Sequence, residues 1–451
     1  SWPDPIEVEP VEDIDTPRMG VFVCHCGSNI AGVVDVEQVV EFAKELPGVV
    51  FASNQMFSCA GNTQQEIEEA MKAEKIHRVV VAACSPKTHE SIFRGVMLRA
   101  GLNPYLLEMS NIRNMDSWVH KNEKEAATQK ANDMVWMAVE KARRLTPLEI
   151  SELPLIQKAL VIGGGIAGMT AAAAIADQGY ETHLVERGSR LGGMLNDLDE
   201  IAPANIQAGA LLAAKSHQVY ESGVKVHLDT AVETVGGVVG NFRATLSDGS
   251  GFEVGALVVA TGAIPSRPEE FECSRDPRVI TNLDLEAMLK DEVPDAKRIT
   301  FIACVGARQG NHGCSRYCCT SMIAQALRMR KMGKKVRVLY KEIRTYSRQA
   351  EELYEDACRA GVQFIRYDPD QPPQREITWQ DDHLRVHDHL LGADLLIPTD
   401  LVVLVVGLHP SSDDLADQLK LSRSDDGFYM ELHPKLGPVQ TAVQGVFLAG
   451  T

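Results

Sequence analysis

The stretch "VIGGGIAGMTAA", residues 161–172, decides the expected fold of the larger part of the chain. Gly163, Gly165 and Gly168 have the G-x-G-x-x-G spacing, directly after an apolar strand and at the start of a predicted helix. In this arrangement the first glycine permits a tight turn, the second lets a pyrophosphate approach the backbone, and the third lets the helix pack closely on the strand. The helix N-terminus favours the negative charge of the pyrophosphate. The stretch therefore predicts a dinucleotide-binding α/β domain.

Three further motifs extend this prediction to a flavin site. Glu186, in "VERGSRLGGML" (185–195), ends the next strand, where its carboxylate can accept hydrogen bonds from a ribose hydroxyl. Strands in "ALVVATGA" (256–263) and "GVFLAGT" (445–451) follow. Together these motifs resemble the FAD-binding half of the two-dinucleotide-domain flavoproteins, the family of thioredoxin reductase, in which the last motif usually ends in Gly-Asp rather than Gly450-Thr451. The candidate FAD-binding residues are Gly163, Gly165, Ile166, Ala167, Gly168, Glu186, Arg187, Gly192, Gly193, Met194, Ala260, Thr261, Gly262 and Gly450.

Composition limits the classes of function. The chain has 451 residues, enough for two or three domains, and its 45% hydrophobic content is typical of a soluble globular protein. A formal net charge of −17 argues against nucleic acid as a partner, because phosphate binding needs a basic face. We find no apolar run long enough to span a bilayer and no secretory signal, and we expect a cytoplasmic protein. In a reducing compartment the ten cysteines are more readily ligands or free thiols than disulfides.

The order of predicted elements indicates an α/β fold: an N-terminal parallel α/β domain, then a thioredoxin-reductase-like FAD domain with an inserted second Rossmann-like domain. In the FAD domain, "DLLIPTDLVVLVVG" (394–407) and the terminal strand are expected to return to the first sheet. Because the chain stops within a strand-to-helix turn, we expect the polypeptide to continue beyond Thr451. The expected divisions are an acidic extension at 1–18, the N-terminal domain with a linker helix at 19–145, the first part of the FAD domain at 146–295, the inserted domain at 296–394, and the returning part at 395–451.

Four cysteines occupy the place where the inserted domain would carry its own glycine motif for a nicotinamide cofactor. They lie in "CVGARQGNHGCSRYCC" (304–319) as Cys304, Cys314, Cys318 and Cys319. A redox-active dithiol would usually show C-x-x-C, and a structural zinc favours paired C-x2-C knuckles. A [4Fe–4S] cluster can accept unevenly spaced thiolates from a loop and a helix start. The spacing favours the cluster, with zinc and unligated thiols as alternatives.

Four more cysteines, Cys24, Cys26, Cys59 and Cys84, are spread through the N-terminal domain. Each follows an apolar predicted strand. The carboxyl ends of parallel strands meet at one edge of a sheet, where such sheets bind ligands. We therefore expect these four thiols to converge in space, although a single buried cysteine is common in any protein. Cys273 and Cys358 lack this context and are interpreted as ordinary thiols.

The combined motifs resemble the A-type subunit family of the heterodisulfide reductases over residues 19–451. In the first domain the resemblance is carried by "GVFVCHCGSNIAGVVDV" (20–36), "VVAACSPKTHE" (80–90), "AGLNPYLLEMSNIR" (100–113) and "SWVH" (117–120), and in the flavin core by the glycine motif, "CSRYCCT" (314–320) and "VRVLYKEIRTY" (336–346). The resemblance implies an FAD- and iron–sulfur-containing oxidoreductase subunit of an anaerobic multi-subunit electron-transfer complex. Each cysteine quartet would then ligate one [4Fe–4S] cluster. Partners would be subunits of the heterodisulfide reductase B and C types, or a hydrogenase- or dehydrogenase-linked subunit.

The sequence departs from this family in two respects. Members usually carry ferredoxin-type C-x2-C-x2-C-x3-C-P segments, and none occurs here. Many have a lysine in the helix after the adjacent cysteines, where this chain has Ala324, and the nearby Lys341, Arg344 and Arg348 could replace it only in part. The first function hypothesis is a redox relay in which FAD exchanges electrons with both clusters, with electron bifurcation slightly favoured over simple transfer. The alternatives are a self-contained NAD(P)H-dependent flavin disulfide oxidoreductase and a scaffold with structural cofactors. No catalytic Ser/His/Asp or Cys/His arrangement stands out.

Overall fold

The computed structural model describes residues 17–149, 154–269, 271, 273, 275–411 and 413–450. Nearly all of the expected acidic extension, and Thr451 of the last flavin motif, lie outside the described residues. The chain divides into two units, residues 1–152 (unit 1) and 153–451 (unit 2). Among the described residues, no helix is both long and apolar enough to cross a bilayer.

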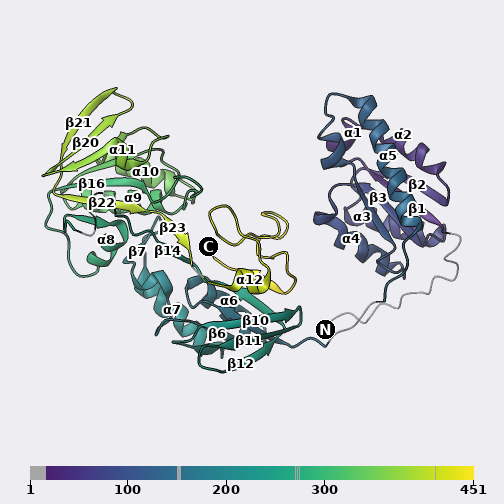
Figure 1. Ribbon diagram of the computed structural model, residues 1–451, viewed down its shortest axis with the longest axis horizontal. Coiled ribbons are helices and arrows are strands. Elements are labelled where there is room, and N and C mark those ends of the chain that lie inside the picture. The colour runs from purple at the N-terminus through teal and green to yellow at the C-terminus, as the bar shows by residue number, and fades with distance from the viewer. Residues whose placement is uncertain are drawn as a thin grey trace. The chain divides into compact units, whose positions relative to one another are not determined.

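Unit 1 is built on a parallel four-stranded sheet in the order β2-β1-β3-β4 (Figure 1). Its central strands are buried along their whole length, as their uninterrupted apolar sequences require. One face of the sheet packs against α2 and α5, and the other against α3 and α4. The elements are β1 (Met19–Cys24), α1 (Ser28–Ala31), α2 (Val36–Lys44), β2 (Val49–Gln55), α3 (Gly61–Ala73), β3 (Arg78–Ala83), α4 (Pro86–Arg99), β4 (Leu107–Asn111), the π-helical turn η1 (Arg113–Ser117) and α5 (Lys124–Arg143).

The first sheet of unit 2 has five parallel strands in the order β24-β13-β5-β6-β9. Helices α6 and α7 pack together over this sheet, and a small antiparallel sheet, β10-β11-β12, lies beside it. The elements are β5 (Lys158–Ile162), α6 (Ile166–Ala176), β6 (Glu181–Val185), the 3-10 helix η2 (Gly193–Asn196), β7 (Glu200–Ile201), β8 (Ile206–Gln207), α7 (Ala208–Glu221), β9 (Lys225–His227), β10 (Val232–Val238), β11 (Asn241–Leu246), β12 (Gly251–Val254), β13 (Ala256–Val259) and β24 (Val446–Leu448).

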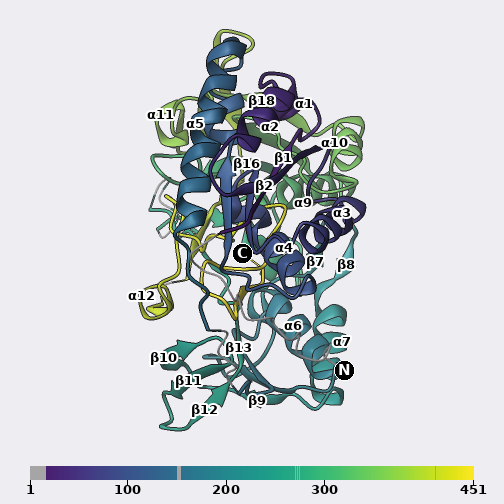
Figure 2. The ribbon, with the colours of Figure 1, turned by 90° about the vertical axis from the view of Figure 1, so that its right-hand side faces the viewer.

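The second sheet of unit 2 is also parallel, in the order β15-β22-β16-β17-β18, and lies at the opposite end of the unit from β10–β12 (Figures 1 and 2). The paired strands β14 and β23 run between the two halves. The elements are β14 (Ala263–Pro265), β15 (Val279–Thr281), α8 (Asn282–Met288), β16 (Arg298–Val305), α9 (Cys318–Lys331), β17 (Lys335–Tyr340), α10 (Ala350–Arg359), β18 (Gln363–Arg366), α11 (Pro373–Glu376), β19 (Ile377–Gln380), β20 (His383–Asp388), β21 (Ala393–Pro398), β22 (Leu401–Val406), β23 (Leu408–Pro410) and α12 (Leu415–Leu419).

The strand expected to return to the first sheet at 401–406 belongs to the second sheet instead. β22 lies between β15 and β16, and all six of its residues are buried. An apolar strand of this kind needs a neighbour on each edge and a covering on each face, which the second sheet provides. Among the described residues after β22, β24 pairs with β13 of the first sheet, and α12 packs in the core of the flavin half. The α/β fold class predicted from the sequence is confirmed.

Candidate cofactor sites

The glycine motif of unit 2 has the backbone geometry of a pyrophosphate cradle. Gly163 has a φ of +111°, and a Cβ there would collide with the carbonyl oxygen of Ala260. A Cβ at Gly168 would collide with the carbonyl oxygen of Gly163, so α6 packs directly on the turn. At Gly165, in contrast, no protein atom lies within 4 Å of the position of a Cβ. The middle glycine therefore leaves open space at the N-terminus of α6, where a pyrophosphate would bind.

Glu186 is held at this turn by two backbone donors. Its Oε2 accepts a hydrogen bond from the Gly164 amide at 2.6 Å, and its Oε1 accepts one from the Gly188 amide at 2.7 Å. Glu186, Arg187 and Thr261 line a cavity of about 400 Å³ beside Gly163. This cavity has the position expected for the ribose end of a dinucleotide.

The remaining candidate residues surround the same turn. The Gly192 amide donates to the Gly164 carbonyl at 2.8 Å, and a Cβ at Gly193 would lie 3.1 Å from the Gly165 Cα. A Cβ at Gly450 would lie 3.0 Å from the Ala167 Cβ. Gly262 has a φ of +68°, and no protein atom lies within 4 Å of the position of a Cβ there. Ile166, the first residue of α6, is partly exposed. The structure thus brings the candidate FAD residues of four separate motifs together.

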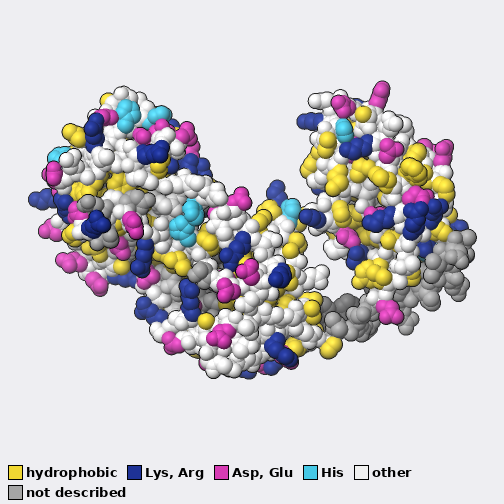
Figure 3. All heavy atoms as spheres, in the orientation of Figure 1, with side chains coloured by type: hydrophobic (Ala, Val, Ile, Leu, Met, Phe, Trp, Pro, Cys, Tyr) yellow, Lys and Arg dark blue, Asp and Glu magenta, His cyan; other side chains and the backbone are white. Residues whose placement is uncertain are grey.

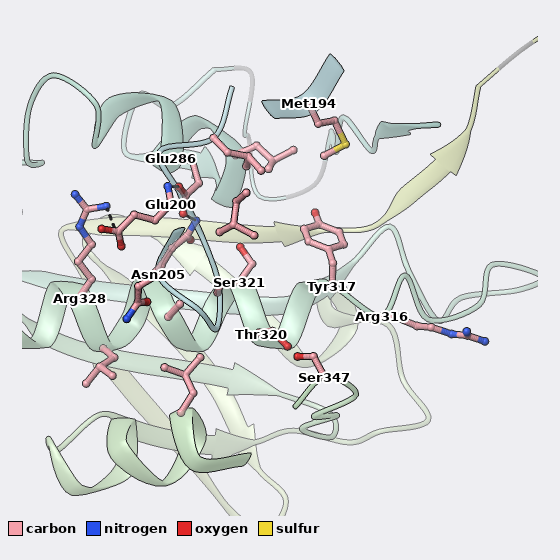
Figure 4. Close-up of a pocket in the computed structure, with 18 of the residues that line it drawn as sticks. Met194, Glu200, Asn205, Glu286, Arg316, Tyr317, Thr320, Ser321, Arg328 and Ser347 are labelled. Atoms are coloured by element: carbon pink, nitrogen blue, oxygen red, sulfur yellow. Dashed lines mark hydrogen bonds and ion pairs between the residues drawn. The ribbon is translucent and has the colours of Figure 1, made fainter. Parts of the chain in front are cut away.

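A cavity of about 610 Å³ lies between the flavin half of unit 2 and α9 (Figure 4). Met194 lines it from one side, and Tyr317, Thr320 and Ala324 line it from the α9 side. Figure 4 shows Arg316 pointing away from the other labelled side chains. Because α9 begins with Cys318 and Cys319, one helix joins the predicted flavin site to the second cysteine quartet.

Cys304, Cys314, Cys318 and Cys319, the second quartet, are close enough to influence one another's ionisation. Burial, and then the neighbouring Cys319, raises the pKa of Cys304 to about 11. Burial and the thiols of Cys304, Cys319 and Cys314 raise the pKa of Cys318 well above its usual value. Cys304 is the next-to-last residue of β16 and has a left-handed conformation with a φ of +63°, and α9 supplies the adjacent pair. Cys304, Cys318 and Cys319 belong to one buried core cluster, and Cys314 is close enough to affect the pKa of all three.

Cys24, Cys26, Cys59 and Cys84, the first quartet, also meet at the carboxyl edge of their sheet. The Sγ of Cys24 accepts hydrogen bonds from the Cys26 amide at 3.3 Å and the Ser58 amide at 3.4 Å. Burial, followed by the thiols of Cys24 and Cys84, raises the pKa of Cys59. Backbone amides directed at a sulfur stabilise negative charge on it, which suits a thiolate ligand.

Neither quartet has the compact geometry of a single-ion site. Within the described ranges, no group of three or more His, Cys, Asp or Glu side chains is arranged to hold one metal ion. A [4Fe–4S] cluster takes one thiolate at each of its four irons, so its ligands need not converge on a point. All eight cysteines lie within the described residues, and none of them forms a disulfide.

Comparison with known proteins identifies the family. The pyridine nucleotide-disulphide oxidoreductase family matches residues 132–291. An A-type iron–sulfur subunit of the CoB–CoM heterodisulfide reductase of Methanopyrus kandleri is 36% identical, over 97% of this chain and 82% of that protein. The chain belongs to the heterodisulfide reductase A-type subunit family. The A-type subunit of the H(2):CoB-CoM heterodisulfide,ferredoxin reductase of Methanothermobacter marburgensis is 35% identical over 98% of this chain and 82% of its own length. Among solved structures, a thioredoxin reductase from T. acidophilum is similar, with 16% identity, a TM-score of 0.48, and coverage of 65% of this chain and 90% of that one.

Membership in the heterodisulfide reductase A-type subunit family confirms the resemblance inferred from the motifs and makes the chain an oxidoreductase. The family match over residues 132–291 supports FAD as a cofactor, and a self-contained NAD(P)H-dependent disulfide oxidoreductase is not favoured. The alignment with the Methanopyrus relative runs over 551 positions, although this chain has 451 residues. The relative therefore contains inserted residues that have no counterpart here.

Two polar contacts to the first quartet were not predicted from the sequence. His89 Nδ1 lies 3.2 Å from Cys84 Sγ, and Arg113 Nη1 donates to Cys26 Sγ at 3.5 Å. Arg113 follows β4 by two residues, so the rule that located the cysteines at strand ends would also have located this guanidinium. His89 lies within α4 and has no comparable signal.

Asp116, next to this edge in η1, provides a prediction about pH. It is fully buried, and neither carboxylate oxygen has a hydrogen-bond partner among the described residues. The nearby Lys130 ammonium is engaged elsewhere, donating to the Met115 carbonyl at 2.7 Å. Burial raises the pKa of Asp116 from 3.8 to about 6. The folded state then binds more protons than the unfolded state between these values, so stability falls as pH rises through this window.

Replacing Asp116 with Asn should therefore stabilise unit 1 at pH values above the raised pKa of about 6. We expect the free energy of unfolding at about pH 7.5 to rise by up to about 3 kcal/mol, with a smaller gain at about pH 5. Denaturant titration at both pH values measures the difference. The exposed Asp133→Asn is the control and should change neither value. An equal gain at both pH values would mean that the charge of Asp116 is not the cause.

Proposed function

We propose that this chain is the FAD- and iron–sulfur-containing electron-transfer subunit of a heterodisulfide-reductase-like complex. In this proposal the glycine motif of unit 2 holds one FAD, and each quartet ligates one [4Fe–4S] cluster. FAD exchanges electrons in pairs or singly and iron–sulfur clusters exchange them singly, which is the chemistry such a protein supplies. The observation that carries the proposal is α9, which contributes Cys318 and Cys319 at its start and lines the cavity shared with Met194.

The state of the thiols supports ligation over a catalytic dithiol. A reactive dithiol needs a thiol whose pKa is lowered toward neutrality. In the second quartet burial raises the pKa of Cys304, Cys318 and Cys319 instead, so these thiols would be inert as nucleophiles. Bonding to iron removes the thiol proton and offsets the cost of burying the sulfur. The residues thus fit a metal cluster better than a disulfide-exchange site.

The edge of unit 1 supports a protein partner at the first quartet. Unit 1 has hydrophobic side chains on its surface (Figure 3). Met56 and Phe57 are 58% and 47% exposed, and the Met56 carbonyl lies 4.0 Å from Cys24 Sγ. Trp118 is 52% exposed, and the Arg113 guanidinium stacks on it at 4.8 Å. Exposed apolar groups around a partly buried redox centre suit docking of another redox protein.

The partners proposed for this chain are a heterodisulfide-reductase B- or C-like subunit, or a hydrogenase- or dehydrogenase-linked one. The compartment proposed is the cytoplasm, because thiolate ligands need reducing conditions. The proposed function requires only that FAD and the clusters exchange electrons. Electron bifurcation, in which one donor pair is divided between two acceptors, is a more specific form of the same proposal. Ala324 supplies only a methyl group to the cavity wall, where many family members have a lysine.

Cofactor analysis of the intact chain tests this function. Protein purified anaerobically should contain about eight irons, with matching sulfide, and about one FAD per chain. Dithionite should reduce both kinds of cofactor, and the reduced protein should give cluster EPR signals. NADH alone should leave the flavin oxidised. Flavin bleaching in proportion to added NADH, in protein that lacks iron, would overturn the proposal in favour of the disulfide-reductase alternative.

A further inference from the structure

Two cationic side chains are buried against the second quartet. Lys341 follows directly after β17 and is only 2% exposed. The carbonyl oxygen of the next residue, Glu342, accepts a hydrogen bond from Cys319 Sγ at 3.8 Å, which places this segment beside the quartet. The thiol of Cys304 favours the charged form of Lys341 and opposes the lowering of its pKa by burial. Arg308 lies in the loop after β16, with its side chain 19% exposed, and its charge favours the thiolate forms of Cys304 and Cys319.

The carboxylates of the protein offset these cations only in part. Arg308 Nη2 pairs with Glu342 Oε2 at 2.9 Å, but Arg344 Nη2 pairs with the same oxygen at 2.9 Å. Arg308 Nη1 is buried and has no hydrogen-bond partner among the described residues. Lys341 forms no ion pair within the described part of the chain. The other charged groups that face Lys341 are Arg308, Asp368 and Asp370.

Burying a cation is costly, because the charge loses its hydration in a medium of low dielectric constant, and the carboxylate that Arg308 shares with Arg344 offsets this cost only in part. Arg308 remains protonated in any protein environment, so its charge cannot be relieved by loss of a proton. An anion at the thiols would balance it. Four thiolates around a [4Fe–4S] core carry such a charge, whereas four neutral thiols do not.

We infer that Arg308 and Lys341 compensate the negative charge of a cluster held by the second quartet and thereby raise its reduction potential. The inference rests on the proposed function. One-electron reduction by a low-potential donor adds one negative charge to the cluster and neither forms nor breaks a bond. Two fixed positive charges therefore stabilise the reduced state more than the oxidised state. Both residues and the second quartet belong to unit 2, whereas the first quartet belongs to unit 1.

The experiment is an EPR-monitored redox titration of the whole chain, with dithionite and mediators. Arg308→Gln and Lys341→Met each remove one charge with little change in length. In both variants the midpoint potential of one cluster should shift to more negative values, and that of the other cluster should not move. Lys335→Met is the matched control, since Lys335 is exposed at the opposite end of the same strand, β17. It should leave both potentials unchanged.

Normal iron content with unmoved potentials in both variants would overturn the inference. Absence of iron from the unsubstituted chain would overturn the proposed function instead, so the two failures are distinguishable. If Lys341→Met loses iron, the pair Arg308→Gln and Arg308→Lys decides, because only the first removes the charge. A shift or loss of the cluster in Arg308→Gln that Arg308→Lys restores supports compensation, and identical behaviour of the two variants overturns it.

Discussion

A chain carrying Gly165→Val should fold normally but bind FAD much more weakly. Gly165 has a φ of −72°, which valine also adopts, and no protein atom lies within 4 Å of its Cβ position. The added side chain would therefore occupy space that the protein leaves open and that the pyrophosphate needs. Overpacking of this kind costs about 1–3 kcal/mol, equivalent to about 5- to 150-fold weaker binding.

The measurements are flavin absorbance of the purified chain, FAD affinity by titration, and thermal unfolding of the FAD-free protein. Gly236→Val is the matched control, because Gly236 in β10 also has nothing within 4 Å of its Cβ position and a strand accepts valine. It should retain FAD. Gly168→Val is expected to lower stability as well, since its Cβ would collide with the Gly163 carbonyl. Full FAD occupancy in Gly165→Val would mean that the pyrophosphate of FAD does not bind at the N-terminus of α6.

The flavin motif was predictable because its constraints are local. Gly163 must turn tightly beneath Ala260 and Gly168 must admit the helix, and both requirements follow from the spacing of the motif. The convergence of the first quartet was predictable from a coarser rule: parallel strands end at a common edge. That rule needs only the order of strands and helices, which the apolar runs of unit 1 indicate clearly.

What the sequence could not predict depends on packing between distant segments. The run at 401–406 is equally apolar whether it lies in the first or the second sheet, so its placement between β15 and β16 is decided by neighbours far along the chain. Likewise, the burial of Lys341 is not visible in the sequence, where a lysine usually indicates a solvated position. The environment of the thiols therefore emerges only from the fold.

Cys319→Ser should remove the second cluster and leave the rest of the chain intact. Cys319 is 8% exposed and lies in the buried core cluster that also holds Cys304 and Cys318, and neither Cys273 nor Cys358 is part of that cluster. A serine hydroxyl is a poor ligand for iron, so we expect the iron content to fall by about four per chain, roughly half, with FAD retained. Iron and sulfide analysis, together with the EPR spectrum of the reduced protein, measures this loss.

Two further variants make the assignment specific. Cys59→Ser should remove the other half of the iron and a different EPR signal, because Cys59 belongs to unit 1. Cys358→Ser should change nothing, since this exposed thiol on α10 is outside both quartets. The double variant Cys59→Ser/Cys319→Ser should then be free of iron but still yellow with FAD. Retention of iron in the double variant would contradict both ligand sets at once. If either single variant lost all of its iron, the clusters would not be independent, and the division of ligands between the two units would be wrong.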